Sequence, residues 1–335
     1  MITTTLMRLA VVIIALAAAS SVRSAHPAAV EPLHLENVIP MEDVQGRIDH
    51  LSVDVRGQRL FVAALGNNTL EVIDLGAGKR LHAIHGLAAP QGILYVPATG
   101  RIFVANDKDG SVRIFDGTSF GLLKTISYGD DADNLRYDNA TGHVYVAYGS
   151  GVLGEMDQDG TKVADIRLDA HPESFQLEKS GPRIFVNQPD SLKIAVIDRR
   201  SKTVTTTWRT GGPLANFPMA LDENHHRLFV VCRLPARLVI FDTDHGNRIT
   251  SIPAIGDCDD VFYDERRHRI YAIGGEGGIA VFQQQDPDHY SEIARIATVS
   301  GARTGLFSPD LDKLYVAVRR HGSLPAGIRV YSLAP

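Results

Sequence analysis

A short motif recurs seven times along this chain, at intervals of 40 to 44 residues. Each copy has a basic residue and, two positions later, an aromatic residue within an aliphatic run. A polar turn and a second aliphatic run follow, and the second run usually ends in Asp. The aromatic positions are Phe61, Phe103, Tyr145, Phe185, Phe229, Tyr271 and Tyr315. A unit this short cannot bury its own apolar surface, so it must stack on copies of itself.

The first repeat shows the internal structure of the unit. Four short segments rich in β-forming residues, at 50–54, 59–64, 69–74 and 80–84, are separated by turns that contain Gly, Asn or Gln. Four antiparallel strands in about 42 residues are typical of a propeller blade. No segment has a convincing apolar period of 3.6 residues, which excludes a helical solenoid.

The two ends of the chain complement each other. The last repeat supplies only three strands and stops after residues 327–333, whereas residues 33–39 form an extra strand before the first repeat. Pairing these two segments would close the ring and remove an open sheet edge. We therefore predict an all-β fold: a seven-bladed β-propeller of four-stranded antiparallel blades, closed by an N-terminal strand that completes the last blade.

The first 24 residues have the pattern of a secretory signal peptide. Arg8 precedes an apolar run at 9–19, and Val22 and Ser24 offer small residues for cleavage. An uncleaved membrane anchor is the alternative, but the run is shorter than the roughly 20 residues that a spanning helix needs. We expect a single propeller domain at 25–335, periplasmic or secreted, with no membrane span in the mature chain.

Charge narrows the choice of partners. The full chain has 34 basic and 39 acidic residues; removal of 1–24 deletes Arg8 and Arg23 and no acid, leaving 32 against 39, or −7. This balance, with no basic stripe, argues against a nucleic acid partner. We expect a monomer that engages a small polar ligand or an exported protein.

The repeats also carry a family resemblance. Residues 60–63 and 66–74, and likewise 102–106 and 110–116, are similar to the "YVAN…NTVSVID" signature of YVTN-type (YncE-like) bacterial seven-bladed β-propellers. The resemblance covers essentially the whole mature chain. It implies an exported propeller whose scaffold carries binding, lactonase-like, lyase-like or redox-partner functions, and so leaves the activity broad.

The expected strand directions place one set of loops on a single rim of the channel. These are the loops that lead into strand one of each blade and those that join strands two and three. Their candidate ligand-binding residues are Arg47, Asp49, His50, Gln91, Asn106, Asp133, His171, Glu173, Asn187, Asp259, Arg303 and Arg319. The same loops also carry Asp107, Asp131, Asn134 and Arg233. Innermost strands converge on a narrow channel, where polar groups that meet form a binding site. The alternative is that these side chains only solvate a surface.

The most specific version of the binding-site hypothesis is that the rim binds a metal ion. The candidate ligands are His50, Asp133, Glu173 and Asp259. Carboxylates suit calcium or magnesium, and imidazole with carboxylate suits zinc or a similar ion. The sequence has no HExxH, EF-hand or paired-cysteine motif. A divalent metal ion therefore stays an open expectation.

Two local features allow alternatives. Residues 319–327 form a longer, basic loop in the seventh repeat, which either covers the channel mouth or is a drifted loop without consequence. Cys232 and Cys258 lie on the same rim in adjacent repeats, and form either a disulfide or two buried thiols.

Three functions fit these observations. The first is an exported binding module for a small polar ligand or a protein partner at the channel mouth. The second is a metal-assisted enzyme of the lactonase or lyase type that uses the same rim. The third is a scaffold that recognises other exported proteins through exposed apolar patches. The sequence leaves catalysis open.

Overall fold

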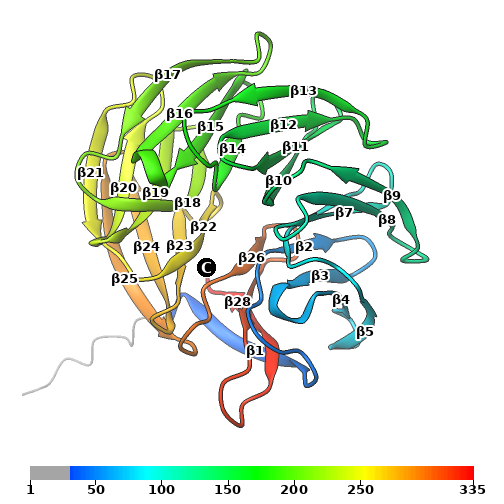
Figure 1. The fold of residues 1–335 in the computed structure, drawn as a ribbon. Coiled ribbons are helices and arrows are strands. Elements are labelled where there is room, and N and C mark those ends of the chain that lie inside the picture. The colour runs from blue at the N-terminus through cyan, green and yellow to red at the C-terminus, as the bar shows by residue number, and fades with distance from the viewer. Residues whose placement is uncertain (1–30) are drawn as a thin grey trace, which may run out of the picture. The chain divides into compact units, whose positions relative to one another are not determined.

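The computed structural model describes residues 31–335, which form seven four-stranded antiparallel sheets arranged as propeller blades (Figure 1). The first strands of neighbouring blades contact one another all round the ring. These innermost strands are β2 (Leu51–Asp54), β6 (Pro90–Val96), β10 (Ala132–Asp138), β14 (Phe175–Leu177), β18 (Leu214–Asp222), β22 (Cys258–Asp264) and β26 (Gly305–Ser308). The predicted seven-bladed fold is confirmed.

The other strands follow outward in each blade. The second strands are β3 (Arg59–Ala64), β7 (Arg101–Asn106), β11 (His143–Tyr148), β15 (Arg183–Gln188), β19 (Arg227–Leu234), β23 (Arg269–Gly274) and β27 (Lys313–Val318). The third strands are β4 (Thr69–Asp74), β8 (Ser111–Asp116), β12 (Val152–Met156), β16 (Lys193–Asp198), β20 (Ala236–Asp242), β24 (Gly278–Asp286) and β28 (Ala326–Leu333). The outer strands are β5 (Lys79–Ile84), β9 (Leu122–Ser127), β13 (Lys162–Arg167), β17 (Thr203–Arg209), β21 (Arg248–Pro253), β25 (His289–Ala297) and β1 (Leu33–Met41). Two 3-10 turns, η1 (Leu65–Asn67) and η2 (Pro189–Ser191), are the helical segments among residues 31–335.

Each blade buries both of its faces against its neighbours. In β3, Leu60 and Val62 pack with the last blade, while Phe61 and Ala63 point the opposite way and pack with the second blade. Seven apolar clusters are found in residues 31–335, and each is shared by two adjacent blades. This explains why the repeat shows an unbroken aliphatic run instead of polar alternation.

In five of the seven repeats the basic residue ties its blade to the next. Arg59 forms an ion pair with Asp54 at 2.6 Å and also donates a hydrogen bond to the backbone carbonyl of Gly117 in the second blade. Four further repeats do the same: Arg101 to Gln158, Arg183 to Thr243, Arg227 to Pro287 and Arg269 to Ala334. In the other two repeats, His143 and Lys313 pair with carboxylates instead, Glu155 and Glu36. These last two pairs lie within one blade, so the regular spacing of the motif reflects an interblade clamp in five repeats and the apolar core in all seven.

The ring is closed as predicted. β1 runs antiparallel along β28, from Leu33 opposite Leu333 to Met41 opposite Ala326, with one bulge between Leu35 and Asn37. β1 therefore extends two residues beyond the predicted segment 33–39. Its buried side chains join the clusters on both sides of the last blade, with Ile39 in one and Leu33 in the other.

The remaining expectations have mixed outcomes. The predicted signal peptide at 1–24 lies outside the described residues. Within residues 31–335 no helix is long and apolar enough to cross a membrane. Cys232 and Cys258 are both free and buried, and burial raises the pKa of the Cys232 thiol to about 12. Of the two alternatives for this pair, the structure has the buried thiols.

We predict that β1 stabilises the whole ring through its buried face alone. Ile39 is 1% exposed and Val38 is 51% exposed on the same strand. Ile39→Ala should lower the free energy of unfolding by about 2–5 kcal/mol because it opens a cavity between two blades. Val38→Ala, the matched control, should change it by less than about 0.5 kcal/mol. Chemical denaturation measures both, and equal effects would contradict closure by β1.

Candidate functional site

A cavity of about 210 Å³ lies at one mouth of the central channel, and every blade contributes to it. Nine of the sequence candidates line it: Arg47, Asp49, His50, Gln91, Asp133, His171, Glu173, Asp259 and Arg303. The other lining residues are Asp107, Asp131, Asn134, Ser174, Phe217 and Arg233. The loops that strand direction placed on one rim therefore do line a single cavity.

Irregularities at the start of the innermost strands turn side chains toward this cavity. In β6, β10, β18 and β22 the ladder to the second strand shifts register just after the strand begins. The residues in these shifts include Gln91, Asp133, Phe217 and Asp259, and all four line the cavity. A bulge re-aims a side chain in this way and is common beside functional sites. The same device recurs in four blades, so the site is a product of the repeat.

Three candidates lie outside the cavity. Asn106 and Asn187 are fully buried. Asn106 accepts a hydrogen bond from the amide of Ala88, and Asn187 donates one to the carbonyl of Phe217 in the next blade. Arg319 is exposed and does not line the cavity, and its neighbour Arg320 donates to the carbonyl of Glu42. The loop at 319–327 therefore contacts the segment after β1.

One side of the cavity is a network of arginines and carboxylates. Arg303 contacts Asp259 at 2.5 Å and Asp257 at 2.9 Å. Arg233 pairs with Asp259 as well, and its guanidinium lies 3.8 Å from the ring centroid of Phe217. Arg47 pairs with Asp49 at 2.9 Å. The positive charges on this side are thus already matched by carboxylates.

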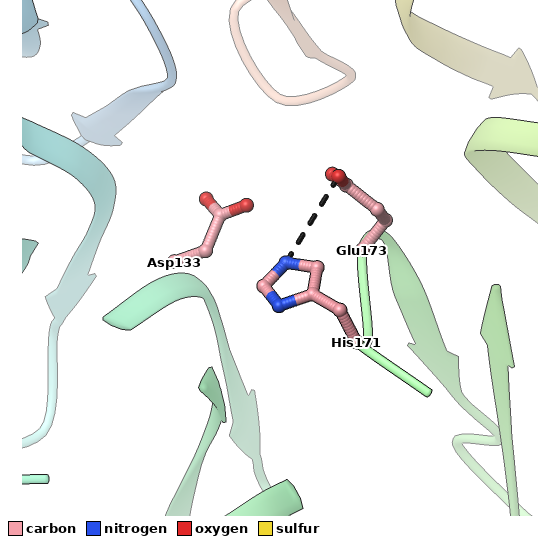
Figure 2. Close-up of side chains that lie close together, drawn as sticks. All are labelled: Asp133, His171 and Glu173. Atoms are coloured by element: carbon pink, nitrogen blue, oxygen red, sulfur yellow. Dashed lines mark ion pairs between the residues drawn. The ribbon is translucent and has the colours of Figure 1, made fainter. Parts of the chain in front are cut away.

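The opposite side has carboxylates without such partners. Asp133 is 6% exposed, and its Oδ1 atom has no hydrogen-bond partner among residues 31–335. Figure 2 shows the side chains of Asp133, His171 and Glu173 close together. Each offers one atom that lies within 4.8 Å of those of the other two. These three residues are called the carboxylate–histidine cluster below. His50 and Asp259, which the sequence also suggested as metal ligands, pair elsewhere: His50 with Asp260 at 3.5 Å and Asp259 with arginines.

Burial and neighbouring charges shift the pKa values of the ionisable side chains in the cavity. Burial, with the charge of Asp259 next in importance, raises the pKa of Glu173 to about 7. Burial, followed by the charge of Glu173, raises the pKa of Asp133 well above its usual value. Burial disfavours a charged His50, but the carboxylates of Asp260, Asp49 and Asp133 together outweigh it and raise the pKa of His50 to about 10. The cavity thus holds carboxylates that ionise at a cost.

Some lining residues escaped the sequence reasoning. Ser174 and Phe217 line the cavity but are not among the candidates from the sequence. The sequence does contain a signal for Phe217, because it precedes the aromatic residue of its repeat by the same 12 positions as Asp133 and Asp259 do. Its role is to support the Arg233 guanidinium.

Comparisons with known proteins agree with this architecture. No protein-family profile and no curated protein matches the chain. It is similar to a chain described as Kuenenia stuttgartiensis Hydrazine Synthase, at 16% identity over 82% of this chain and 94% of that one, with a TM-score of 0.70. It is also similar to a chain of a Crystal Structure of Mitotic Checkpoint Complex, at 13% identity over 96% and 99%, with a TM-score of 0.76. At these identities the similarity shows the fold alone. The chain is a seven-bladed β-propeller.

The raised pKa of Glu173 predicts a specific pH dependence. Because the folded-state pKa of about 7 lies above the ordinary value of 4.5, ionisation favours the unfolded chain. Stability should therefore fall as pH rises from about 4.5 through 7 and stay lower above that. In chelator-treated protein, Glu173→Gln should remove this loss and raise the Tm above wild type by about 2–4 °C at pH 8, but not near pH 4.

Glu36→Gln is the matched control. A hydrogen bond from Lys313 lowers the pKa of Glu36, so removal of its charge should bring no gain at pH 8. Thermal melts from pH 4 to 9 measure all three proteins. A Glu173→Gln protein that is less stable than wild type at pH 8 would show that the carboxylate is structural.

Proposed function

We propose that this propeller is a binding module whose channel mouth takes a small polar ligand that carries positive charge. The observation that carries the proposal is the buried Asp133 carboxylate, which faces an open cavity beside Glu173 with Oδ1 unsatisfied among residues 31–335. A buried charge without a partner is costly, and proteins retain such groups where a ligand completes them.

The distribution of charge supports a cationic ligand over an anionic one. Arg47, Arg233 and Arg303 all pair with carboxylates of the chain, so they offer little free positive charge. In the carboxylate–histidine cluster, neither Asp133 nor Glu173 forms an ion pair with an arginine or lysine among residues 31–335. A protonated amine, either on a free small molecule or on a lysine of an exported partner protein, supplies the matching chemistry.

The cellular setting is part of the proposal. The signal-peptide pattern at 1–24 supports export to the periplasm or the medium, and the repeat signature supports a place among the YVTN-type propellers. Propellers of unrelated sequence share this architecture, so the ligand must be argued from the mouth and not from the fold.

A metal-assisted lactonase or lyase is the second candidate. It is favoured by one observation: Glu173, with a pKa of about 7, lies beside His171 in a group that could hold a metal ion. If Asp133 and His171 held the ion, a Glu173 carboxylate with this pKa could act as a general base at neutral pH. Under this alternative, Glu173→Gln should abolish turnover of a lactone substrate.

The binding proposal predicts selectivity for positive charge. In chelator-treated protein, 1,4-diaminobutane should raise the Tm, whereas 1,4-butanediol and succinate, of similar length, should not. Asp133→Asn should weaken diamine binding at least tenfold, a loss of about 1.4 kcal/mol. Arg319→Gln changes a charge outside the cavity and should bind as wild type does. Titration calorimetry measures the affinities, and equal binding by Asp133→Asn and wild type would rule out this site.

A further inference from the structure

The carboxylate–histidine cluster joins two neighbouring blades. Asp133 comes from the bulged start of β10, and His171 and Glu173 come from the segment that leads into β14. His171 Nε2 lies 4.0 Å from Glu173 Oε1, and the two side chains point toward the same space as Asp133 in Figure 2. One atom of each residue lies within 4.8 Å of the others, a spread that a single ion at about 2.0–2.2 Å from each ligand can draw together.

Asp133 supplies independent support for a ligand at this point. Its side chain is more than nine-tenths buried and lines the cavity, yet Oδ1 has no donor among residues 31–335. His50 is the cation whose charge acts on both Asp133 and Glu173, but its Nδ1 is engaged with Asp260. A cation from outside the chain would give the buried Oδ1 the partner that it lacks among residues 31–335.

The hydrogen bonding of His171 suits a metal ligand. Its Nδ1 lies 2.6 Å from the backbone carbonyl of Gly149, which can only accept, so Nδ1 carries the proton. In the neutral ring, Nε2 then has its lone pair on the side of Glu173 and cannot donate. Metal-binding histidines are commonly held this way, with the other nitrogen donating to a carbonyl.

We propose that Asp133, His171 and Glu173 bind one divalent transition-metal ion, of the Zn²⁺ or Mn²⁺ kind. This inference rests on the proposed function, since it names the cation that the mouth binds. One imidazole and two carboxylates suit these ions better than Ca²⁺, which takes six to eight oxygen ligands. Three protein ligands leave at least one coordination position open toward the cavity, where a polar molecule can reach the ion.

The test measures the metal directly. The chain, treated with chelator and dialysed at pH 7.5, is titrated separately with ZnCl₂, MnCl₂ and CaCl₂ by calorimetry, and bound metal is counted by elemental analysis. We expect one equivalent of Zn²⁺ or Mn²⁺ with a raised Tm, and at least tenfold weaker Ca²⁺ binding. Asp133→Asn and His171→Gln should each weaken Zn²⁺ or Mn²⁺ binding at least tenfold while the far-UV spectrum stays unchanged.

A matched control separates this site from surface histidines. The rings of His225 and His268 lie 5.8 Å apart, far along the chain from the cluster, and are the obvious place for stray zinc. The His268→Gln variant should still bind one equivalent of Zn²⁺ or Mn²⁺. The inference would be overturned if the wild-type protein bound no metal. It would also be overturned if His268→Gln lost the bound metal ion while Asp133→Asn kept it. Diamine binding without metal binding would overturn it too, but would leave the proposed function standing, whereas failure of both would remove both.

Discussion

The packing of blade against blade is the interaction on which the rest of this structure depends. No blade has a core of its own, because alternate residues of one strand, such as Leu60 and Phe61, belong to different apolar clusters. A stack of this kind must either close into a ring or expose an apolar face at each end. β1 and β28 close it by strand pairing, and the clamp made by Arg59 and its counterparts adds polar contacts between successive blades.

Closure also creates the candidate site. It brings the starts of seven innermost strands to one opening, where the bulges of β6, β10, β18 and β22 turn polar and aromatic side chains inward. At this opening, some charged residues stabilise the fold and others do not. Arg303 and Asp259 form an ion pair, while burial and mutual repulsion disfavour ionisation of Asp133 and Glu173. A stable ring can tolerate this local cost, and a bound cation would turn it into binding free energy.

Particular residues show how much of the fold and of the candidate site could be predicted from the sequence. The repeat predicted the blades and the closing strand, and strand direction correctly brought Asp49, Gln91 and Asp259 to one cavity. It misplaced Asn106 and Asn187 because a polar residue at the end of strand two can face the rim or turn back to bond the backbone. Nor could it choose the metal candidates: the choice of His171 over His50 depends on Gly149 and Asp260, which are remote in sequence.

The central claim is that the carboxylates at the channel mouth are completed by a cation. Anomalous diffraction from crystals of natively purified protein, with data on both sides of the zinc and manganese absorption edges, tests it most directly. The account predicts a single strong peak within bonding distance of Asp133, His171 Nε2 and Glu173. A mouth without a peak, in which Asp133 and Glu173 share a proton and lie within hydrogen-bonding distance, would contradict it.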